Sequence, residues 1–322
     1  MRITVFLLGW FLLFPSIFTP TTQAQESKYW VFYTDKKDVT FDPYAYFDAK
    51  AIERRQMQGI SLYDSSDFPL NKDYTSLVAN LAEQTGFESR WFNAQIVYAN
   101  EAQINAIQSL PFVKETILIT PSWSVPAEIK PEDAEPESFA IDVDSGLLQQ
   151  QLANMGGEWF VENGITGKGV RVAVFDVGFK GVDQHAAFEH LRANNRILKT
   201  YDFVKDDEFV YDYGSHGRSV LSCIAGIYQG KMIGLAPEAE FLLARTEYAT
   251  REPLAEEEFW MAAAEWADRN GADIINSSLG YTHHRYFVSD MNGATSLVTR
   301  AANMAASKGI LVVNSMGNSG SD

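Results

Sequence analysis

The sequence is poor in cysteine and in cations. Its one cysteine, Cys223, cannot form a disulfide within the chain or a cysteine-cluster zinc site, and we expect it to be small core filling. The 26 Lys and Arg residues against 42 Asp and Glu residues give a net charge of −16. That balance argues against nucleic acid as a partner, because phosphate binding needs clustered cations. With 46% hydrophobic residues, the 322-residue chain has enough apolar side chains for a packed core, and its length predicts about two domains.

Beyond the N-terminal segment, the sequence has no apolar run long enough to span a membrane. At the N-terminus, Arg2 precedes a largely apolar run over 3–18, and a cut after Ala24 would leave small residues at the −3 and −1 positions. This pattern predicts a secretory signal peptide over residues 1–24 and export to the periplasm, the cell surface or the medium. A stable membrane anchor is the weaker interpretation, because Pro15 interrupts the run and a bilayer requires about 20 apolar residues.

Residues 25–120 alternate between strand and helix patterns. We expect, in order, a strand over 29–33, helices over 47–57 and 73–83, an extended segment over 89–98, a helix over 101–110 and a strand over 113–119. This order predicts a small α+β domain with a ferredoxin-like arrangement, and none of its residues suggests catalysis. Residues 121–140 then carry a proline at every fifth position among acidic residues, which is typical of a linker.

Residues 141–322 have the pattern of a second class of domain. Strands are expected over 170–175, 196–203, 240–245, 273–277 and 310–315, and helices over 217–227, 254–269 and 295–307. Nearly continuous apolar strands that alternate with helices predict an α/β fold, an open parallel sheet with helices on both faces. A ligand site in such a sheet is expected at the carboxyl ends of the strands.

Three polar side chains fall at these strand and helix ends. Asp176 ends the first strand of the sheet and is followed by Val177 and Gly178; the alternative is a turn or N-cap aspartate. His216 stands between glycines where a helix begins, although a lone histidine is more often structural. Asn318 follows a buried strand in a glycine turn, where its amide would face a developing oxyanion, or it is a plain turn asparagine.

As an ordered set, these residues resemble the subtilisin-like serine peptidases. The matching blocks are Gly167-Lys168-Gly169-Val170, Asp176-Val177-Gly178, His216-Gly217-Arg218, Gly234-Leu235-Ala236-Pro237, Asn276-Ser277-Ser278-Leu279-Gly280 and Gly317-Asn318. The resemblance spans roughly residues 164–322 and is closest to secreted bacterial members. The domain over 25–120 looks like the inhibitory propeptide of such enzymes.

The resemblance implies acyl transfer by a Ser-His-Asp triad on protein or peptide substrates. Asp176 would orient the imidazole, His216 would act as general base and acid, and Asn318 would stabilise the oxyanion. The segment Ser278-Leu279-Gly280 would pair with the backbone of the substrate. The protein's own propeptide would be its intramolecular inhibitor.

Departures from the family pattern are equally informative. The block Gly-Thr-Ser-x-Ala-x-Pro, which carries the family's nucleophile, is missing from the sequence, and Gly293-Ala294-Thr295-Ser296 is interpreted as the start of a helix. We therefore expect a C-terminally incomplete precursor that carries the Asp, the His and the oxyanion Asn but not the Ser. Val177 replaces a hydroxyl residue and Arg218 replaces a threonine; we expect the Arg218 side chain to point to solvent.

A catalytically inactive, subtilisin-like peptide-binding protein is the main alternative, and an actin-like ATPase is disfavoured because no phosphate loop follows the Asp176 strand. Members of the family often bind Ca²⁺ through loop oxygens, but no ligand spacing here identifies a calcium site or any other metal site. The pair His283-His284 is interpreted as surface loop because adjacent side chains point apart in extended chain.

Overall fold

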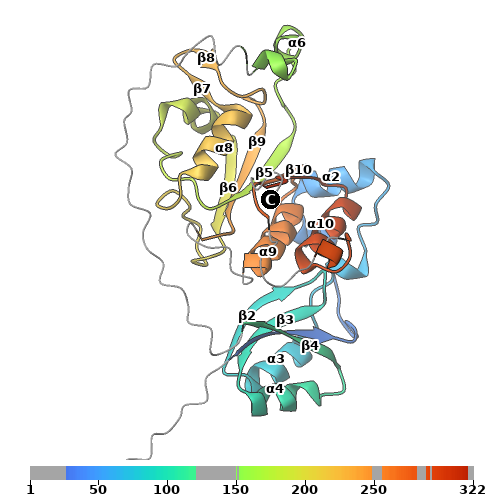
Figure 1. The fold of residues 1–322 in the computed structure, drawn as a ribbon. Coiled ribbons are helices and arrows are strands. Elements are labelled where there is room, and N and C mark those ends of the chain that lie inside the picture. The colour runs from blue at the N-terminus through green and yellow to red at the C-terminus, as the bar shows by residue number, and fades with distance from the viewer. Residues whose placement is uncertain are drawn as a thin grey trace, which may run out of the picture.

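The computed structural model describes residues 27–120, 150, 152–248, 256–280, 288–290 and 292–317. The predicted signal peptide, the predicted linker and His283-His284 lie outside these residues. Figure 1 shows the described elements as stacked layers: α3 and α4, an antiparallel sheet, α9 and α10, a parallel sheet, and α8. No helix among the described residues combines the length and the apolar composition that crossing a membrane requires.

The N-terminal domain is built on a four-stranded antiparallel sheet of order β2-β3-β1-β4. Its strands are β1 (Ser27–Tyr33), β2 (Gln84–Ser89), β3 (Ala94–Ala99) and β4 (Val113–Thr120), and one face is covered by α3 (Lys72–Leu81) and α4 (Glu101–Gln108). This is the βαββαβ order of the ferredoxin-like arrangement, which confirms the predicted fold class of this domain. Two further helices, α1 (Pro43–Tyr46) and α2 (Ala49–Met57), lie between β1 and α3 in the chain.

One expected segment of this domain is wrong. Residues 89–98 do not form one extended run: they comprise the end of β2, a turn over 90–93 and most of β3. The helix predicted over 73–83 is α3, which ends at Leu81, before β2. The turn lacks the glycine or proline that would have marked it in the sequence. Asn93 instead takes the left-handed conformation (φ 50°), and the Ser89 hydroxyl accepts a hydrogen bond from the Phe92 N–H.

The second domain contains a five-stranded parallel sheet of order β11-β10-β5-β9-β6. Its strands are β5 (Arg171–Asp176), β6 (Ile197–Asp202), β9 (Glu240–Arg245), β10 (Ile274–Ser277) and β11 (Leu311–Asn314). One face packs on α8 (His216–Ala225), and the other on α9 (Glu256–Arg269) and α10 (Leu297–Ser307). Every residue of β5 is buried, as expected for a central parallel strand, and the predicted α/β sheet with helices on both faces is confirmed.

Short elements fill the connections of this domain. They are α6 (Gly157–Glu162), α7 (Glu189–Ala193), β7 (Ile227–Tyr228), β8 (Lys231–Met232) and the 3₁₀ turns Ala186–Phe188 and Val288–Asp290, with a further 3₁₀ turn, Ser65–Asp67, in the N-terminal domain. Ser296 is the N-cap of α10, as the interpretation of 293–296 as a helix start requires. Of these short elements, α6 and α7 are helices of slightly more than one turn, and each 3₁₀ turn has three residues.

Cys223 is exposed, so the expectation that it fills the core is wrong. The residues of α8 that are buried against the sheet are Gly217, Leu221 and Ala225, spaced four apart. A residue two positions after Leu221 is rotated by about 200° around the helix axis. Cys223 therefore lies on the side of α8 that faces away from the sheet.

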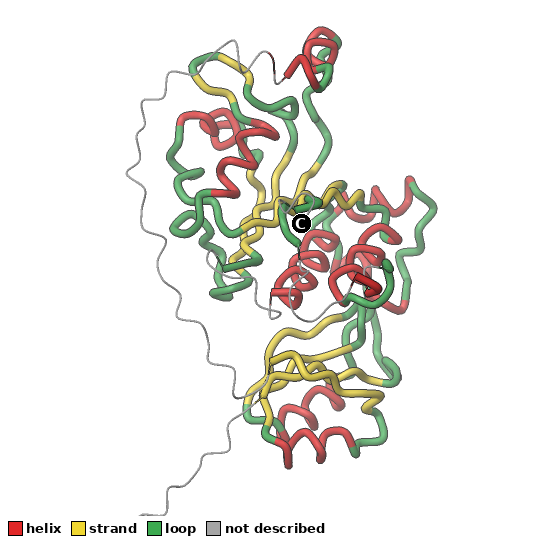
Figure 2. Tube along the Cα trace, in the orientation of Figure 1, coloured by secondary structure: helices red, strands yellow, loops and turns green. Residues whose placement is uncertain are grey.

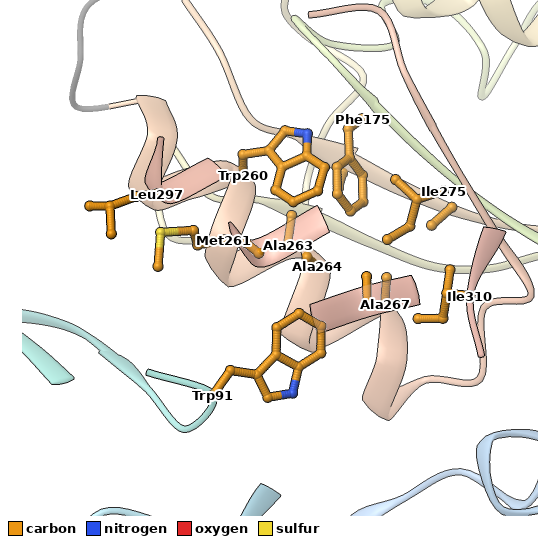
Figure 3. Close-up of a cluster of buried hydrophobic side chains, with 14 of the residues drawn as sticks. Trp91, Phe175, Trp260, Met261, Ala263, Ala264, Ala267, Ile275, Leu297 and Ile310 are labelled. Carbon is orange, nitrogen blue, oxygen red and sulfur yellow. The ribbon is translucent and has the colours of Figure 1, made fainter. Parts of the chain in front are cut away.

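Helices α9 and α10 lie between the two sheets, as the helix segments between the strand layers in Figure 2 show. One apolar cluster runs through α9 from the N-terminal domain to the parallel sheet and includes Trp91, Met261 and Phe175. Figure 3 shows Trp91 on one side of α9 and Trp260 with Phe175 on the other; the last two rings meet edge to face at 5.6 Å. The two domains thus share a continuous hydrophobic core.

One carboxylate of α9 is buried by the N-terminal domain. Glu265 accepts hydrogen bonds from the Ser89 hydroxyl and from the backbone N–H groups of Arg90 (3.0 Å) and Trp91 (3.3 Å), in the turn after β2. These donors favour the ionised carboxylate, but burial outweighs them and raises the pKa of Glu265 to about 7. The proton on this carboxyl is therefore coupled to the packing of the two domains.

We expect Glu265→Gln to flatten the dependence of stability on pH. A carboxyl whose pKa rises from 4.5 in the unfolded chain to about 7 binds its proton more tightly when folded, so its contribution to stability falls as pH rises through that window. Urea unfolding at pH 5 and pH 8 should show the wild type losing about 2.5 kcal/mol relative to the variant. Parallel pH curves for the two proteins would contradict the assignment.

Candidate active site

The structure brings Asp176 and His216 together at the carboxyl edge of the parallel sheet. Asp176 is the last residue of β5 and His216 is the first residue of α8. The imidazole Nδ1 lies 2.9 Å from Asp176 Oδ1 and 3.0 Å from Oδ2. The carboxylate is fully buried, whereas the histidine side chain is 61% exposed. A buried acceptor therefore holds one side of an imidazole whose remainder is open to solvent.

The Asp176 carboxylate is held by several donors. The Val177 N–H donates to Oδ1 at 2.9 Å, and the Ser278 hydroxyl makes a further hydrogen bond to the carboxylate. Burial raises the pKa of Asp176, and His216 and these hydrogen bonds lower it in part. The carboxylate is thus fixed in orientation on both sides, which in turn fixes the plane of the imidazole.

Two glycines allow α8 to approach the end of β5 this closely. A Cβ on Gly217 would lie 2.5 Å from the Gly178 carbonyl oxygen and 3.0 Å from Asp176 Cβ. Gly178 has φ 146°, and a Cβ there would lie 2.0 Å from the Tyr213 carbonyl oxygen. Because neither glycine has a Cβ, the neighbouring backbone can pack directly against it. This close packing brings the start of α8 near the end of β5 and so sets the distance between Asp176 and His216.

The segment predicted to bind substrate backbone follows β10, the neighbour of β5 in the sheet. Ser278 reaches the Asp176 carboxylate, Leu279 is buried, and Gly280 is exposed. The Asn314 side chain, at the end of β11, donates to the Leu279 carbonyl oxygen at 2.9 Å. Asn314 was missed by sequence reasoning, although a polar residue that ends an apolar strand is the same signal that singled out Asp176. Asn318 lies outside the described residues.

The two departures from the family pattern have different outcomes. Val177 packs against Gly214, and its backbone N–H supplies a hydrogen bond to Asp176, so the lost hydroxyl does not leave the carboxylate without a local donor. The Arg218 guanidinium does not extend freely into solvent, as expected, but is half-buried and donates to the Lys180 carbonyl oxygen at 3.2 Å. The expectation of a solvent-directed Arg218 is therefore wrong.

A buried ion pair beside the site was also missed. Arg245 faces Asp176 across β5 and β9, and Asp202 across β9 and β6. Its guanidinium lies 2.8 Å from Asp202 Oδ2 and 3.8 Å from the ring centroid of Tyr213, three residues before His216. The sequence signal was a lone cation that ends the apolar run of β9. This pair supports the turn that leads into His216.

Among the described residues, no three His, Cys, Asp or Glu side chains gather as a metal site would require. Calcium held largely by backbone carbonyl oxygens is a separate case, and the expectation for it stays a prediction.

Two family models match the chain in succession. Residues 28–135 match the peptidase S8 propeptide domain of Bacteroidota, and residues 167–322 match the subtilase family. The alkaline protease of Alkalihalobacillus alcalophilus is 31% identical over 194 residues, which are 59% of this chain and 43% of the relative. The alkaline elastase YaB of Bacillus sp. strain YaB is 27% identical over 271 residues, 77% of this chain and 65% of the relative. The chain thus spans less than two thirds of either relative.

A solved structure shares the fold of both domains. Fervidolysin from Fervidobacterium pennivorans, a keratinolytic enzyme related to subtilisin, aligns with 92% of this chain and 40% of its own, with a TM-score of 0.52 and 17% identity. At this identity the likeness concerns the fold alone, and it agrees with the order of domains that the two family models give. Residues 167–322 therefore belong to the subtilase family of peptidases, and they follow a propeptide domain of the peptidase S8 type.

Proposed function

We propose that this chain is part of the precursor of an exported serine endopeptidase, with Asp176 and His216 as two members of its triad. The observation that carries the proposal is the hydrogen-bonded pair of a fully buried carboxylate and an exposed imidazole at the carboxyl edge of the sheet. The nucleophilic serine is expected from sequence beyond these 322 residues, since the family's nucleophile block is missing from them. The N-terminal domain is the propeptide and inhibitor.

The chemistry follows from the orientation of the imidazole. With the Nδ1 proton donated to Asp176, Nε2 is the free base that takes the proton from the serine hydroxyl as its oxygen attacks the peptide carbonyl. Asp176 stabilises the imidazolium that results, and His216 then gives the proton to the leaving amine. Water repeats the sequence on the acyl-enzyme and restores the serine. Asn318 donates to the oxyanion, a contact whose loss typically costs about 10²–10³ in rate.

Substrate would lie along the segment after β10. Ser278, Leu279 and Gly280 follow β10 directly at the carboxyl edge of the sheet, and the Asn314 amide donates a hydrogen bond to the Leu279 carbonyl oxygen. An extended peptide that pairs with the backbone of this segment would be recognised largely through main-chain hydrogen bonds. We therefore expect a peptide substrate bound in extended form, with its scissile carbonyl beside His216.

A serine-directed fluorophosphonate probe tests the proposal. A chain extended by its downstream coding sequence should be labelled, and His216→Ala should abolish labelling because the serine is no longer deprotonated. The 322-residue chain is the matched control and should stay unlabelled. If the folded, extended chain does not react, the peptidase proposal is wrong.

A catalytically inactive peptide-binding protein is the second candidate. It is favoured by one observation, the segment after β10, whose Leu279 carbonyl oxygen accepts a hydrogen bond from the Asn314 amide and which can pair with a peptide without any nucleophile. Such a protein would keep the segment after β10 but would have no nucleophile to react with the probe. Absence of labelling together with saturable peptide binding would support it.

A further inference from the structure

Helix α2 docks on the peptidase domain at a place remote from the active site. Figure 1 shows it beside α10 and β10, away from the N-terminal domain's own sheet. Lys50 Nζ lies 2.6 Å from the Gly169 carbonyl oxygen, just before β5. Gln58 donates to the carbonyl oxygen of Gly309, just before β11, at 3.0 Å. These turns precede the strands, so α2 touches the amino edge of the sheet, opposite the edge that carries Asp176.

The turns that receive α2 are shaped for close approach. Gly271 (φ 77°) and Gly309 (φ 88°) follow α9 and α10. A Cβ on Gly271 would lie 2.9 Å from Lys50 Cβ, and one on Gly309 would lie 2.6 Å from the Gln58 side-chain oxygen. Both glycines suit their left-handed conformation, and both also leave the space that the helix occupies. The two turns therefore form a seat that fits α2.

A cluster of charges is buried where α2 meets this seat. The N-terminal domain contributes Arg54, Arg55 and Asp67, and the peptidase domain contributes Asp268 and Lys308; all five are at most 4% exposed. Asp268 accepts from both arginines, and Asp67 pairs with Arg55 at 2.9 Å and with Lys308 at 3.0 Å. Buried charges are costly without partners. The seat is thus selective for a helix that presents two adjacent arginines.

Within the part of the chain that the structure describes, the hydrogen bonds of the Arg54 guanidinium all cross the interface. Its guanidinium donates to Asp268 and to the carbonyl oxygens of Ala272 and Lys308, all in the peptidase domain. Arg55, in contrast, also pairs with Asp67 of its own domain. Replacement of Arg54 therefore removes hydrogen bonds between the domains and leaves the ion pair of Arg55 with Asp67, within the N-terminal domain, in place.

We propose that the amino edge of the parallel sheet, with the C-terminal ends of α9 and α10, is a second docking site of the propeptide, occupied by α2 and lying beyond the part of α9 and α10 that the antiparallel sheet covers. Two linked contacts raise the overall affinity by about 10²–10⁴ over one. The propeptide consequently stays bound after the chain between the domains is cut, and its release requires α2 to leave its seat. This inference rests on the proposed role of the N-terminal domain, not on the chemistry of Asp176 and His216.

The dissociation rate of the propeptide tests the inference without any peptidase activity. A recognition sequence for a site-specific protease is placed within 121–140 of the 322-residue chain, the folded chain is cut, and the separation of the two pieces is followed by surface plasmon resonance. Arg54→Met should speed dissociation by about 10²-fold or more, since a buried pair is broken. Lys72→Met, an exposed cation on α3, should match the wild type.

A second pair of variants covers the case in which Arg54→Met does not fold. Gln58→Ala removes one hydrogen bond to the seat and should speed dissociation about fivefold, whereas Gln56→Ala, exposed on the same helix, should not. If a folded Arg54→Met protein dissociates at the wild-type rate, or if Gln58→Ala and Gln56→Ala behave alike, the α2 site does not retain the propeptide. Neither outcome bears on labelling by the serine probe, so the two proposals fail separately.

Discussion

Asp176→Asn should reduce kcat of the extended, active enzyme by about 10⁴, with little change in KM. An asparagine of the same shape at the end of β5 keeps the packing, but its amide can donate to Nδ1, whereas the carboxylate only accepts. The imidazole would then carry its proton on Nε2, where the free base is needed, and the imidazolium would lose its counter-charge. Steady-state hydrolysis of a peptide anilide measures both constants.

A matched variant separates this effect from a general loss of charge. Asp212 is an exposed aspartate four residues before His216, paired with Lys205 on the surface, and Asp212→Asn should leave kcat unchanged. In the 322-residue chain, proton NMR should show a downfield Nδ1–H resonance of His216 that is lost in Asp176→Asn and kept in Asp212→Asn. A kcat within tenfold of wild type in a folded Asp176→Asn enzyme would remove Asp176 from the triad.

Local patterns predicted the elements that carry the site. Asp176 and His216 are 40 residues apart, yet each stands at a strand or helix end that apolar periodicity and glycines mark within a few residues. Because a helix that follows a parallel strand begins near the carboxyl edge of the sheet, the end of β5 and the start of α8 are predicted to lie at the same edge, where the two side chains can meet. The roles of these residues, and that of Asn318, stay predictions.

What the sequence did not reveal depends on partners far away in the chain. Arg54 and Asp268 are separated by 214 residues, and nothing within ten residues of either one identifies the other. The same holds for Arg245, whose partner Asp202 lies 43 residues earlier in the chain but on the neighbouring strand of the sheet. Buried charges in particular escape sequence reasoning, since a charged side chain is by default expected at the surface. The docking of α2 was missed for this reason.

A large loss of stability is expected on replacement of Arg55, which links the two domains within the buried charge cluster. Its side chain is fully buried, pairs with Asp67 and Asp268, and lies 4.2 Å from the ring centroid of Phe47. Arg55→Met keeps much of the apolar contact but leaves two buried carboxylates short of a cation, which typically costs about 3–5 kcal/mol. For a chain of this size the unfolding midpoint should fall by roughly 10 °C.

Calorimetry with a double-mutant cycle tests whether this loss comes from the charges. Lys114→Met, at an exposed position of β4, is the matched control and should unfold as the wild type does. Adding Asp67→Leu to Arg55→Met should recover part of the stability, because one carboxylate no longer lies buried without its arginine. Strictly additive losses in the double variant would mean that Arg55 acts through packing on Phe47 and not through the ion pairs. Recovery would instead assign the junction of the two domains to a cluster in which each charge depends on the others, so that the propeptide and the peptidase domain are selective for each other at the amino edge of the sheet.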